Sequence, residues 1–303
     1  MKRVGIIGLG NMGMGMAKNL VEAGFPLHGF DVRQEPIDAL KKSGGIGLDS
    51  IAAVGRDRDC VFVMVMNGAQ LHSIVLGQDG LLEAMTPGSC IIITATIHPS
   101  EIRSLADPAK KKGIEIIDSP VSGGKSGAEE GTLTMMAAAT REVLEEYSDV
   151  MAAVGKTIFH VGETIGQGQV VKAALQALIG ASFSAIFESL VLGTKAGADP
   201  EVLYDVFCAS GVGSALLKNC GELILDRKFE QTGSHIGTMY KDLGISMTMA
   251  RENGCAMFTA AAAYELFQSG ISLFPDGDNW SIVKLLEQIA GTEVKRSGKG
   301  AQK

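Results

Sequence analysis

Close to the start of the sequence stands Val4-Gly5-Ile6-Ile7-Gly8-Leu9-Gly10-Asn11-Met12-Gly13, a short apolar run followed by glycines at the spacing G-x-G-x-x-G. The apolar run is typical of a buried strand, and residues 13–23 after it have helical spacing. In such a unit the first glycine makes a tight turn, the second lets the backbone approach a pyrophosphate, and the third allows close helix packing. The free N–H groups at the helix start would face the anion. The stretch predicts a dinucleotide-binding turn formed by Gly8, Leu9, Gly10, Asn11, Met12 and Gly13.

Asp31 ends the next apolar stretch of the sequence, well after the glycine turn. An acid at this place accepts hydrogen bonds from the adenosine ribose hydroxyls and repels a 2'-phosphate. The pattern therefore favours NAD as cofactor over NADP. Arg33 is the complication, because a guanidinium two residues on could pair with a 2'-phosphate if its side chain turned inward.

The first half of the chain alternates short apolar runs with helical segments. The runs are too short for helices and are bounded by Gly, Pro, Asp or Asn, which is typical of buried strands. The predicted strands are 4–7, 27–30, 60–66, 90–94 and 114–117, with 133–138 and 157–161 continuing the sheet; the predicted helices are 13–23, 35–42 and 99–112. This alternation predicts a doubly wound, Rossmann-type α/β domain over residues 1–163, with helices on both faces of a parallel sheet.

Beyond residue 163 the sequence becomes alanine-rich and has no comparable strands, which predicts an all-helical domain over residues 164–292, entered through a long helix at 169–196. Residues 173–192 are apolar enough to raise the question of a membrane span. Because Lys172, Gln176 and Glu188 flank or interrupt them and no second span is present, we expect no membrane association. An apolar helix of this kind instead favours a homodimer or homotetramer. The polar residues 293–303 predict a disordered tail.

Composition excludes some classes of function. The chain has 303 residues, with 27 Lys and Arg against 34 Asp and Glu, so no dense basic stripe is expected and nucleic acid is not an expected partner. Its five cysteines form no C-x-x-C pair and its five histidines are scattered, so no metal site is predicted. The first apolar stretch is too short for a signal peptide, which together with the cysteine pattern favours a reducing, cytoplasmic location.

Four segments, in order, resemble the β-hydroxyacid dehydrogenases, a family that includes 3-hydroxyisobutyrate dehydrogenase and tartronate semialdehyde reductase. They are Gly8 to Gly13 with Met16-Ala17 and Asn19-Leu20; Asp118-Ser119-Pro120-Val121-Ser122-Gly123-Gly124 continuing to Met135; Gly166-Gln167-Gly168 leading to Lys172; and Lys241-Asp242-Leu243. Together they span nearly the whole chain. In that family a hydride passes between the hydroxyl-bearing carbon of a short hydroxy acid and the nicotinamide.

Lys172 resembles the family lysine that handles the hydroxyl proton. Such chemistry needs an amine that can be neutral, and burial and neighbouring charges are the means by which proteins favour the neutral form of a lysine. Without the resemblance, a lysine at a helix start would be an ordinary surface charge. The resemblance therefore predicts Lys172 as the catalytic residue.

The resemblance also implies the other contacts. Ser122, Gly123 and Gly124 match the substrate segment, where glycines let successive N–H groups point at one carboxylate. Met66, Asn67 and Thr96 follow predicted strands, where parallel sheets bind ligands, and would line the cofactor groove. Lys241 resembles the family lysine that reaches the nicotinamide end of the cofactor.

Gln176 lies one helical turn after Lys172, so the two side chains share a face of the predicted helix. Its amide would contact the lysine or a substrate hydroxyl. Most of the family has Asn here, whereas the L-threonate dehydrogenases also have Gln and resemble Val65-Met66-Asn67-Gly68-Ala69-Gln70. The expected substrate is therefore L-threonate or a similar four-carbon aldonate. The alternatives are 3-hydroxyisobutyrate and tartronate semialdehyde (2-hydroxy-3-oxopropionate).

Two other classes of function stay open at this point. One is a catalytically silent relative that binds a nucleotide and acts as an interaction module, and the other is an imine-reducing relative. In both, the family lysine is usually lost or replaced. The presence of Lys172 favours the hydroxyacid dehydrogenase.

Overall fold

The computed structural model describes residues 1–297 and divides the chain into two compact units, Met1–Ala173 and a second that begins at Ala174. The sequence predicted a boundary after residue 163. The division falls later because the first residues of the long helix α10 (Gln167–Lys195) are counted with the first unit.

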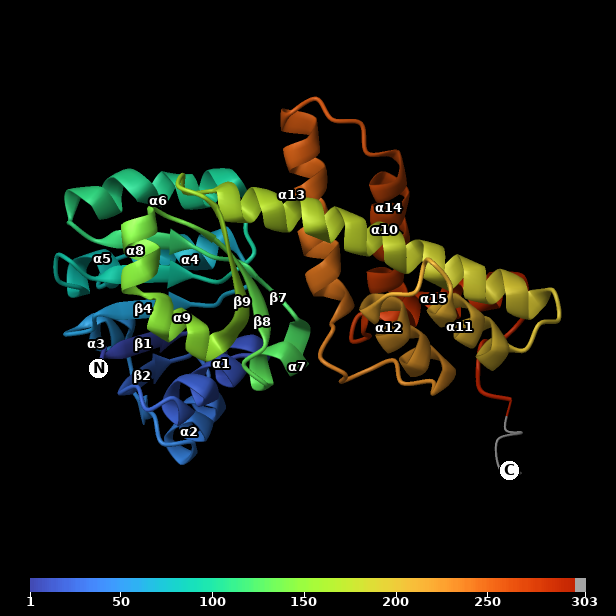
Figure 1. Ribbon diagram of the computed structural model, residues 1–303, viewed down its shortest axis with the longest axis horizontal. Helices are drawn as coiled ribbons and strands as arrows, with labels where there is room; N and C mark the ends of the chain where they lie inside the picture. Colours follow the sequence, from blue (N-terminus) through green and yellow to red (C-terminus); the bar gives the residue numbers. More distant parts are fainter. Residues whose placement is uncertain (298–303) are drawn as a thin grey trace. The chain divides into compact units, whose positions relative to one another are not determined.

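The first unit is built on one sheet, which has nine strands within the described residues, in the order β3-β2-β1-β4-β5-β6-β8-β7, with β9 beside β8 (Figure 1). The strands are β1 (Val4–Ile7), β2 (Leu27–Phe30), β3 (Ile46–Gly47), β4 (Cys60–Val63), β5 (Cys90–Ile93), β6 (Glu115–Asp118), β7 (Val121–Ser122), β8 (Leu133–Ala138) and β9 (Gly155–Gly162). The first six strands of this order, from β3 through β2, β1, β4 and β5 to β6, are parallel. Strand β8 runs antiparallel to β6 and β7. The prediction of a doubly wound sheet is confirmed.

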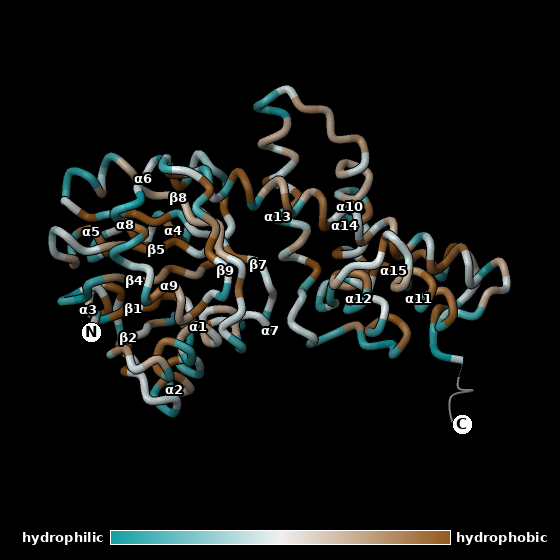
Figure 2. The backbone as a smooth tube through the Cα atoms, viewed as in Figure 1, coloured by the Kyte–Doolittle hydropathy of each residue, from teal (hydrophilic) through white to brown (hydrophobic). Residues whose placement is uncertain are grey.

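Helices cover both faces of the sheet. They are α1 (Asn11–Glu22), α2 (Gln34–Lys42), α3 (Ile51–Gly55), α4 (Gly68–Leu76), α5 (Leu81–Ala84), α6 (Pro99–Lys111), α7 (Gly124–Glu129), α8 (Arg141–Glu146) and α9 (Ser148–Val154). Alternate residues of the central strands point to opposite faces, so Ile6 belongs to the same apolar cluster as Leu20 of α1, while Ile7 belongs to a second cluster with Leu71 of α4. Strands buried on both faces read as continuous apolar runs, which Figure 2 shows along β1, β4 and β5. This is why those runs could be found in the sequence.

The second unit is helical, as predicted. It contains α10 from Ala174 onward, α11 (Pro200–Ala209), α12 (Ala215–Leu225), α13 (Ile236–Glu252), α14 (Phe258–Leu273), the 3-10 turn η1 (Asn279–Ser281) and α15 (Ile282–Ala290). Its core is aromatic, with Phe183 and Phe187 of α10 stacked at 5.7 Å between ring centroids. Trp280 is 2% exposed in the same core and donates its indole N–H to the Lys228 carbonyl at 2.7 Å.

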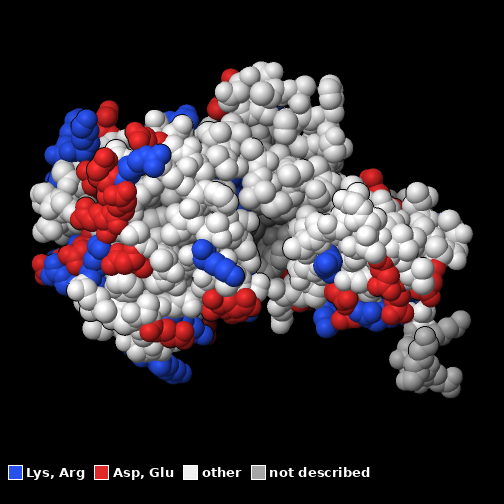
Figure 3. All heavy atoms as spheres, in the orientation of Figure 1, with Lys and Arg blue, Asp and Glu red and all other residues white. Residues whose placement is uncertain are grey.

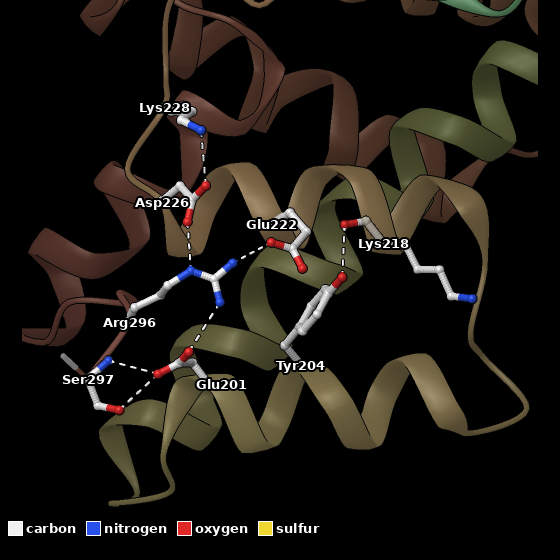
Figure 4. Close-up of polar contacts among 8 residues, drawn as sticks. All are labelled: Glu201, Tyr204, Lys218, Glu222, Asp226, Lys228, Arg296 and Ser297. Atoms are coloured by element: carbon white, nitrogen blue, oxygen red, sulfur yellow. Dashed lines mark hydrogen bonds and ion pairs between the residues drawn. The ribbon is translucent and has the colours of Figure 1, made fainter. Parts of the chain in front are cut away.

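The segment after α15 corrects one prediction. The disordered tail was expected from residue 293, but Val294 is fully buried and residues 293–297 contact the helical unit. Figure 4 shows Arg296 surrounded by carboxylates of α11 and the α12 region, with Asp226 at 2.6 Å, Glu201 at 3.1 Å and Glu222 also paired. The acids come from distant parts of the sequence, so a local reading of the polar tail could not find them. Residues 298–303 lie outside the described part of the chain.

Helix α10 is long and apolar enough, by length and composition, to cross a membrane. Of its most apolar window, 44% is buried within the structure. Lys172 and Gln176, both polar, are each only 6% exposed on this helix, whereas Leu178 and Leu192 are exposed. The helix therefore serves as a core element of the protein and also presents apolar side chains at its surface.

Candidate active site

The predicted cofactor residues of the first unit follow strands whose carboxyl ends lie at one edge of the sheet. Strands β1, β4, β5 and β6 are parallel neighbours in register, so their carboxyl ends lie at the same edge. The glycine turn follows β1, Met66 and Asn67 follow β4, and Thr96 follows β5. From β1 the chain turns to β2 and β3 on one side, and then returns to β4 on the other. Open α/β sheets bind ligands at such a switch point.

The three glycines of the turn are required for different reasons. At Gly8, whose φ is +91°, a Cβ would overlap the Met64 carbonyl, and at Gly13 it would overlap the Gly8 carbonyl. At Gly10 the nearest atom to a Cβ would be an Arg33 guanidinium nitrogen at 3.9 Å, so the space is open. Packing within the protein therefore accounts for Gly8 and Gly13, while Gly10 leaves room for a ligand.

Helix α1 begins directly after this open space. Its N-cap is Gly10, and no side chain caps the first N–H groups of the helix. Uncapped N–H groups at a helix start, together with the helix dipole, form a site for a phosphate. The turn thus fits the pyrophosphate of a dinucleotide on the residues present.

Asp31, directly after β2, is hydrogen-bonded to the backbone of the glycine turn. It is 8% exposed, and its carboxylate accepts the Leu9 N–H at 2.8 Å and both the N–H and Nε–H of Arg33 at 3.0 Å. Burial alone would raise the pKa of Asp31, but the hydrogen bonds from Arg33 and Leu9 together lower it. Asp31 is therefore a fixed carboxylate that stays ionised. The Arg33 side chain is 62% exposed and lies beside the space at Gly10.

Ser122 ends the two-residue strand β7, and Gly123 and Gly124 lead into α7. Their φ values are +137° and +62°, which glycine adopts readily and other residues rarely do. A Cβ at Gly124 would meet no atom within 4 Å, so this backbone also faces open space. Successive N–H groups of such a turn can converge on an anion.

Helix α1 contacts the helix that follows this second turn. Gly15 allows the approach, because a Cβ there would lie 2.6 Å from the Ala128 backbone of α7. Asn19 donates its amide to the Ala128 carbonyl at 2.7 Å. The helix that starts at the dinucleotide turn therefore also fixes α7, and sequence reasoning did not assign this role to either residue.

Asn67 has a local role that the sequence did not predict. Its side-chain oxygen accepts the Gln70 N–H at 2.9 Å and so caps α4. Gln70 in turn accepts the Met66 N–H at 2.9 Å. Met66 is 52% exposed. These hydrogen bonds fix the backbone of Met66 and Asn67 at the carboxyl end of β4. The contact of the two residues with a cofactor stays a prediction.

Lys172 lies near the start of α10 and is 6% exposed, so it is not a solvated surface charge. The start of this helix is held by two buried polar residues that the sequence reasoning did not single out, Asp118 at the end of β6 and Gln169 on α10. Asp118 accepts the N–H groups of Gly166 at 2.8 Å and Gln169 at 3.3 Å. Burial raises the pKa of Asp118 to about 6 despite these hydrogen bonds.

Gln176 and Lys241, the two predicted site residues of the helical unit, are linked by Asp242 of α13. The Gln176 amide donates to Asp242 Oδ2 at 2.5 Å, and Lys241 Nζ lies 2.7 Å from Asp242 Oδ1. Asp242 is 3% exposed. The predicted contact of Gln176 with the lysine or a substrate hydroxyl stays a prediction, but the side-chain amide of Gln176 has an identified partner in Asp242. From the sequence alone, the only indication of a role for Asp242 at the site was its position next to Lys241.

Among residues 1–297, no group of three or more His, Cys, Asp or Glu side chains is placed to hold a metal ion. On the face drawn in Figure 3, basic and acidic side chains lie interspersed and form no single basic stripe.

The chain is similar to known proteins over almost its whole length. A family profile described as the NAD binding domain of 6-phosphogluconate dehydrogenase matches residues 3–162, and one described as NAD-binding of NADP-dependent 3-hydroxyisobutyrate dehydrogenase matches residues 166–286. The 2-(hydroxymethyl)glutarate dehydrogenase of Eubacterium barkeri is 32% identical, covering 96% of this chain and 97% of that protein. An L-threonate dehydrogenase of Cupriavidus necator is 32% identical, covering 95% and 97%. A crystal structure of 3-hydroxyisobutyrate dehydrogenase from Salmonella typhimurium has a TM-score of 0.86 at 28% identity, covering 94% of this chain and all of that one.

Proposed function

Since the chain belongs to the 3-hydroxyisobutyrate dehydrogenase-like family of NAD(P)-dependent hydroxyacid dehydrogenases, we propose that it acts on L-threonate or a similar four-carbon aldonate, with Lys172 as its proton-transfer residue. The observation that carries the catalytic assignment is the burial of Lys172 on a helix whose start is fixed to the sheet edge that bears the dinucleotide turn. A lysine kept from water in this way is suited to exchange a proton with a bound alcohol.

The nicotinamide of the bound cofactor supplies the hydride acceptor or donor. The protein's own residues do the rest. The N–H groups at the start of α1 bind the pyrophosphate in the space at Gly10, and Asp31 accepts from the adenosine ribose hydroxyls. The turn at Ser122 to Gly124 binds the substrate carboxylate and so orients the hydroxyl-bearing carbon. In oxidation, neutral Lys172 takes the proton from the hydroxyl; in reduction, its ammonium returns that proton to the carbonyl oxygen.

We further propose that NAD is preferred over NADP. The support is the ionised, buried carboxylate of Asp31, which would repel a 2'-phosphate. The adjacent guanidinium of Arg33 is engaged by Asp31 through its Nε–H. An arginine that is already paired is a weaker partner for a phosphate than one with no acid beside it.

The preference for a four-carbon aldonate rests on Gln176 and on the similarity to L-threonate dehydrogenases. The competing substrates are 3-hydroxyisobutyrate, tartronate semialdehyde and 2-(hydroxymethyl)glutarate, the last from the name of a relative that is equally similar. Rates of NADH formation on threonate, 3-hydroxyisobutyrate, glycerate and 2-(hydroxymethyl)glutarate, measured side by side at 340 nm, decide between them. The proposal fails if threonate is the poorest of the four.

The role of Lys172 has a direct test. We expect K172A to lower kcat by about two to four powers of ten, because the proton transfer loses its positioned group. NADH binding should be retained, since the dinucleotide turn is untouched. A matched control is K195A, which removes an exposed lysine at the far end of the same helix. Near-normal turnover by K172A would reject the assignment.

A homodimeric or homotetrameric assembly and a cytoplasmic location are also proposals. The assembly is supported by the exposed apolar side chains on α10, such as Leu178 and Leu192. The location is supported by the five cysteines, all of which are free thiols. Light scattering that finds only a 31.7 kDa species would contradict the assembly.

A further inference from the structure

We infer that Gln169 is a positioning residue that locks the Lys172 helix to the strand ends on which cofactor and substrate are bound, with Asp118 as its partner. The inference rests on the proposed role of Lys172, since it concerns how that amine is aligned. Three segments that are far apart in the sequence meet at this one side chain. They are residues 95–97 after β5, Asp118 at the end of β6, and the first turn of α10.

The side-chain amide of Gln169 forms hydrogen bonds with the backbone on both sides of Thr96. Its Oε1 accepts the Ile97 N–H at 3.0 Å, and its Nε2 donates to the Ala95 carbonyl at 3.0 Å. The amide thus pairs with the backbone as a neighbouring strand would, and Thr96 lies between the two hydrogen-bonded residues. Thr96 is the residue that the family resemblance places near the nicotinamide ribose.

The remaining amide hydrogen of Gln169 is donated to Asp118 Oδ1 at 2.9 Å. Every donor and acceptor of this amide therefore has a partner, and its orientation is fixed because Ile97 N–H can only donate while the Ala95 carbonyl and the carboxylate only accept. Gln169 is 1% exposed and Asp118 is fully buried. In a site this dry each bond is strong, and losing one leaves a buried polar group unsatisfied.

Asp118 also fixes the start of α10 through hydrogen bonds. Its other oxygen, Oδ2, accepts the N–H groups of Gly166 and Gln169, so a carboxylate from β6 caps α10. Gly168 lets the helix approach, because a Cβ there would lie 2.6 Å from the Met136 carbonyl and 2.7 Å from that of Asp118. Lys172 follows Gln169 by three residues, so the two side chains are neighbours on the helix surface.

Asp118 also begins the segment that leads to the substrate turn. Four residues after it, Ser122 starts the turn with Gly123 and Gly124. One buried pair of side chains therefore sets the relative places of the proton-transfer lysine, the segment around Thr96 and the carboxylate turn. A displacement of about 1 Å in such an alignment can cost about 10²-fold in rate.

The test compares the full-length Q169L, Q169N, Q169E and D118N variants with wild type. A matched control is Q167L, since Gln167 lies on the same helix turn but accepts the Thr164 N–H and makes no bond to Asp118 or to residues 95–97. The measurements are kcat and KM for the hydroxy acid, the acid limb of the kcat–pH profile, the dissociation constant of NADH by its fluorescence, and the melting curve.

We expect Q169L and Q169N to lower kcat about 10- to 100-fold with a much smaller change in KM for the hydroxy acid, because alignment rather than substrate contact is lost. The acid limb of the kcat–pH profile should move, and the NADH dissociation constant should rise through the segment around Thr96. Q167L should change none of these. Asn is included because it stays polar but is too short to reach all three partners of Gln169, so a variant remains informative if Q169L does not melt cooperatively.

A rescue separates positioning from packing. Q169E places a second carboxylate against Asp118, and D118N replaces one carboxylate oxygen with an NH2 donor that faces the donating amide of Gln169. The double variant D118N/Q169E again pairs one carboxylate with one amide, with donor and acceptor exchanged between the two positions. We expect it to recover kcat relative to Q169E, as a non-additive pair. If K172A is inactive but Q169L and Q169N keep wild-type kcat, pH profile and NADH affinity, the inference is overturned while the proposed function stands. If K172A is as active as wild type, the proposed function fails first.

Discussion

Two aspartates at strand ends of one sheet, separated by the three strands β1, β4 and β5, show opposite electrostatics. Asp31 follows β2 and Asp118 ends β6; both are buried, and both accept backbone N–H groups. Asp31 also has the guanidinium of Arg33, and its pKa is lowered. The donors to Asp118 are neutral amides, and burial raises its pKa to about 6. Two differences act in the same direction: Asp118 is more deeply buried, at 0% exposed against 8% for Asp31, and Asp31 has the Arg33 guanidinium beside its carboxylate.

The difference suits the two proposed tasks. A cofactor contact must be a carboxylate at every working pH, since it accepts hydrogen bonds from ribose. A structural cap needs only acceptors, and Asp118 provides them at a cost in stability that depends on pH. Three experiments test whether the two carboxylates differ in this way.

The largest expected effect is the pH dependence of stability at Asp118. Its pKa is raised in the folded protein, so the folded state holds the proton between about pH 4 and about 6, and stability from this group falls as pH rises through that window. The full cost above pH 6 is about 3 kcal/mol from the size of the shift. D118N does not titrate, so its free energy of unfolding relative to wild type should rise by about that amount from pH 4 to 7. Urea unfolding across this range measures it.

The control for this experiment is D205N, which removes an exposed carboxylate of α11. Its stability relative to wild type should be nearly flat over the same range. An equally flat difference for D118N would show that Asp118 is not the group that burial has shifted. The constant offset of D118N, which comes from its altered hydrogen bonds, does not affect the slope.

The next effect is on the choice of cofactor. D31A removes a charged acceptor from the proposed ribose contact, so kcat/KM for NAD should fall by about 10- to 100-fold while that for NADP is spared or rises. The measurement is the ratio of kcat/KM for the two cofactors. D38A, on the exposed face of α2, serves as the control. An unchanged ratio in D31A would remove Asp31 from the cofactor site.

The smallest effect concerns Arg33. Because its hydrogen bonds help to lower the pKa of Asp31, R33A should raise that pKa. The Asp31 carboxylate would then begin to protonate at a higher pH, so NAD affinity should weaken more between pH 7.5 and pH 5 than it does in wild type. Fluorescence titration of NADH at the two values checks this. If R33A instead strengthens NADPH binding, Arg33 is an obstacle to the 2'-phosphate rather than a partner of it.

The sequence predicted Asp31 and missed the role of Asp118 for a physical reason. Asp31 belongs to a local unit of strand, glycine turn, helix and strand, whose order and spacing can be read along one short stretch of the sequence. Asp118 acquires its role from Gly166 and Gln169, which lie 48 and 51 residues away. The same distinction separates the strands buried on both faces, which were predicted, from the two-residue strands β3 and β7, which were not. Gln176 was placed correctly on its helix, but its partner Asp242 lies 66 residues on.

The three glycines of the first turn answer to different constraints, and this bears on how the fold can change over time. Gly8 and Gly13 are demanded by the protein's own backbone, so a descendant that no longer needs a nucleotide must still keep them to fold. Gly10 is free of that demand, since open space surrounds it apart from one flexible arginine tip. Side chains accumulating at this single position, with its two neighbours in the motif unchanged, would mark a lineage that has given up the ligand and kept the scaffold.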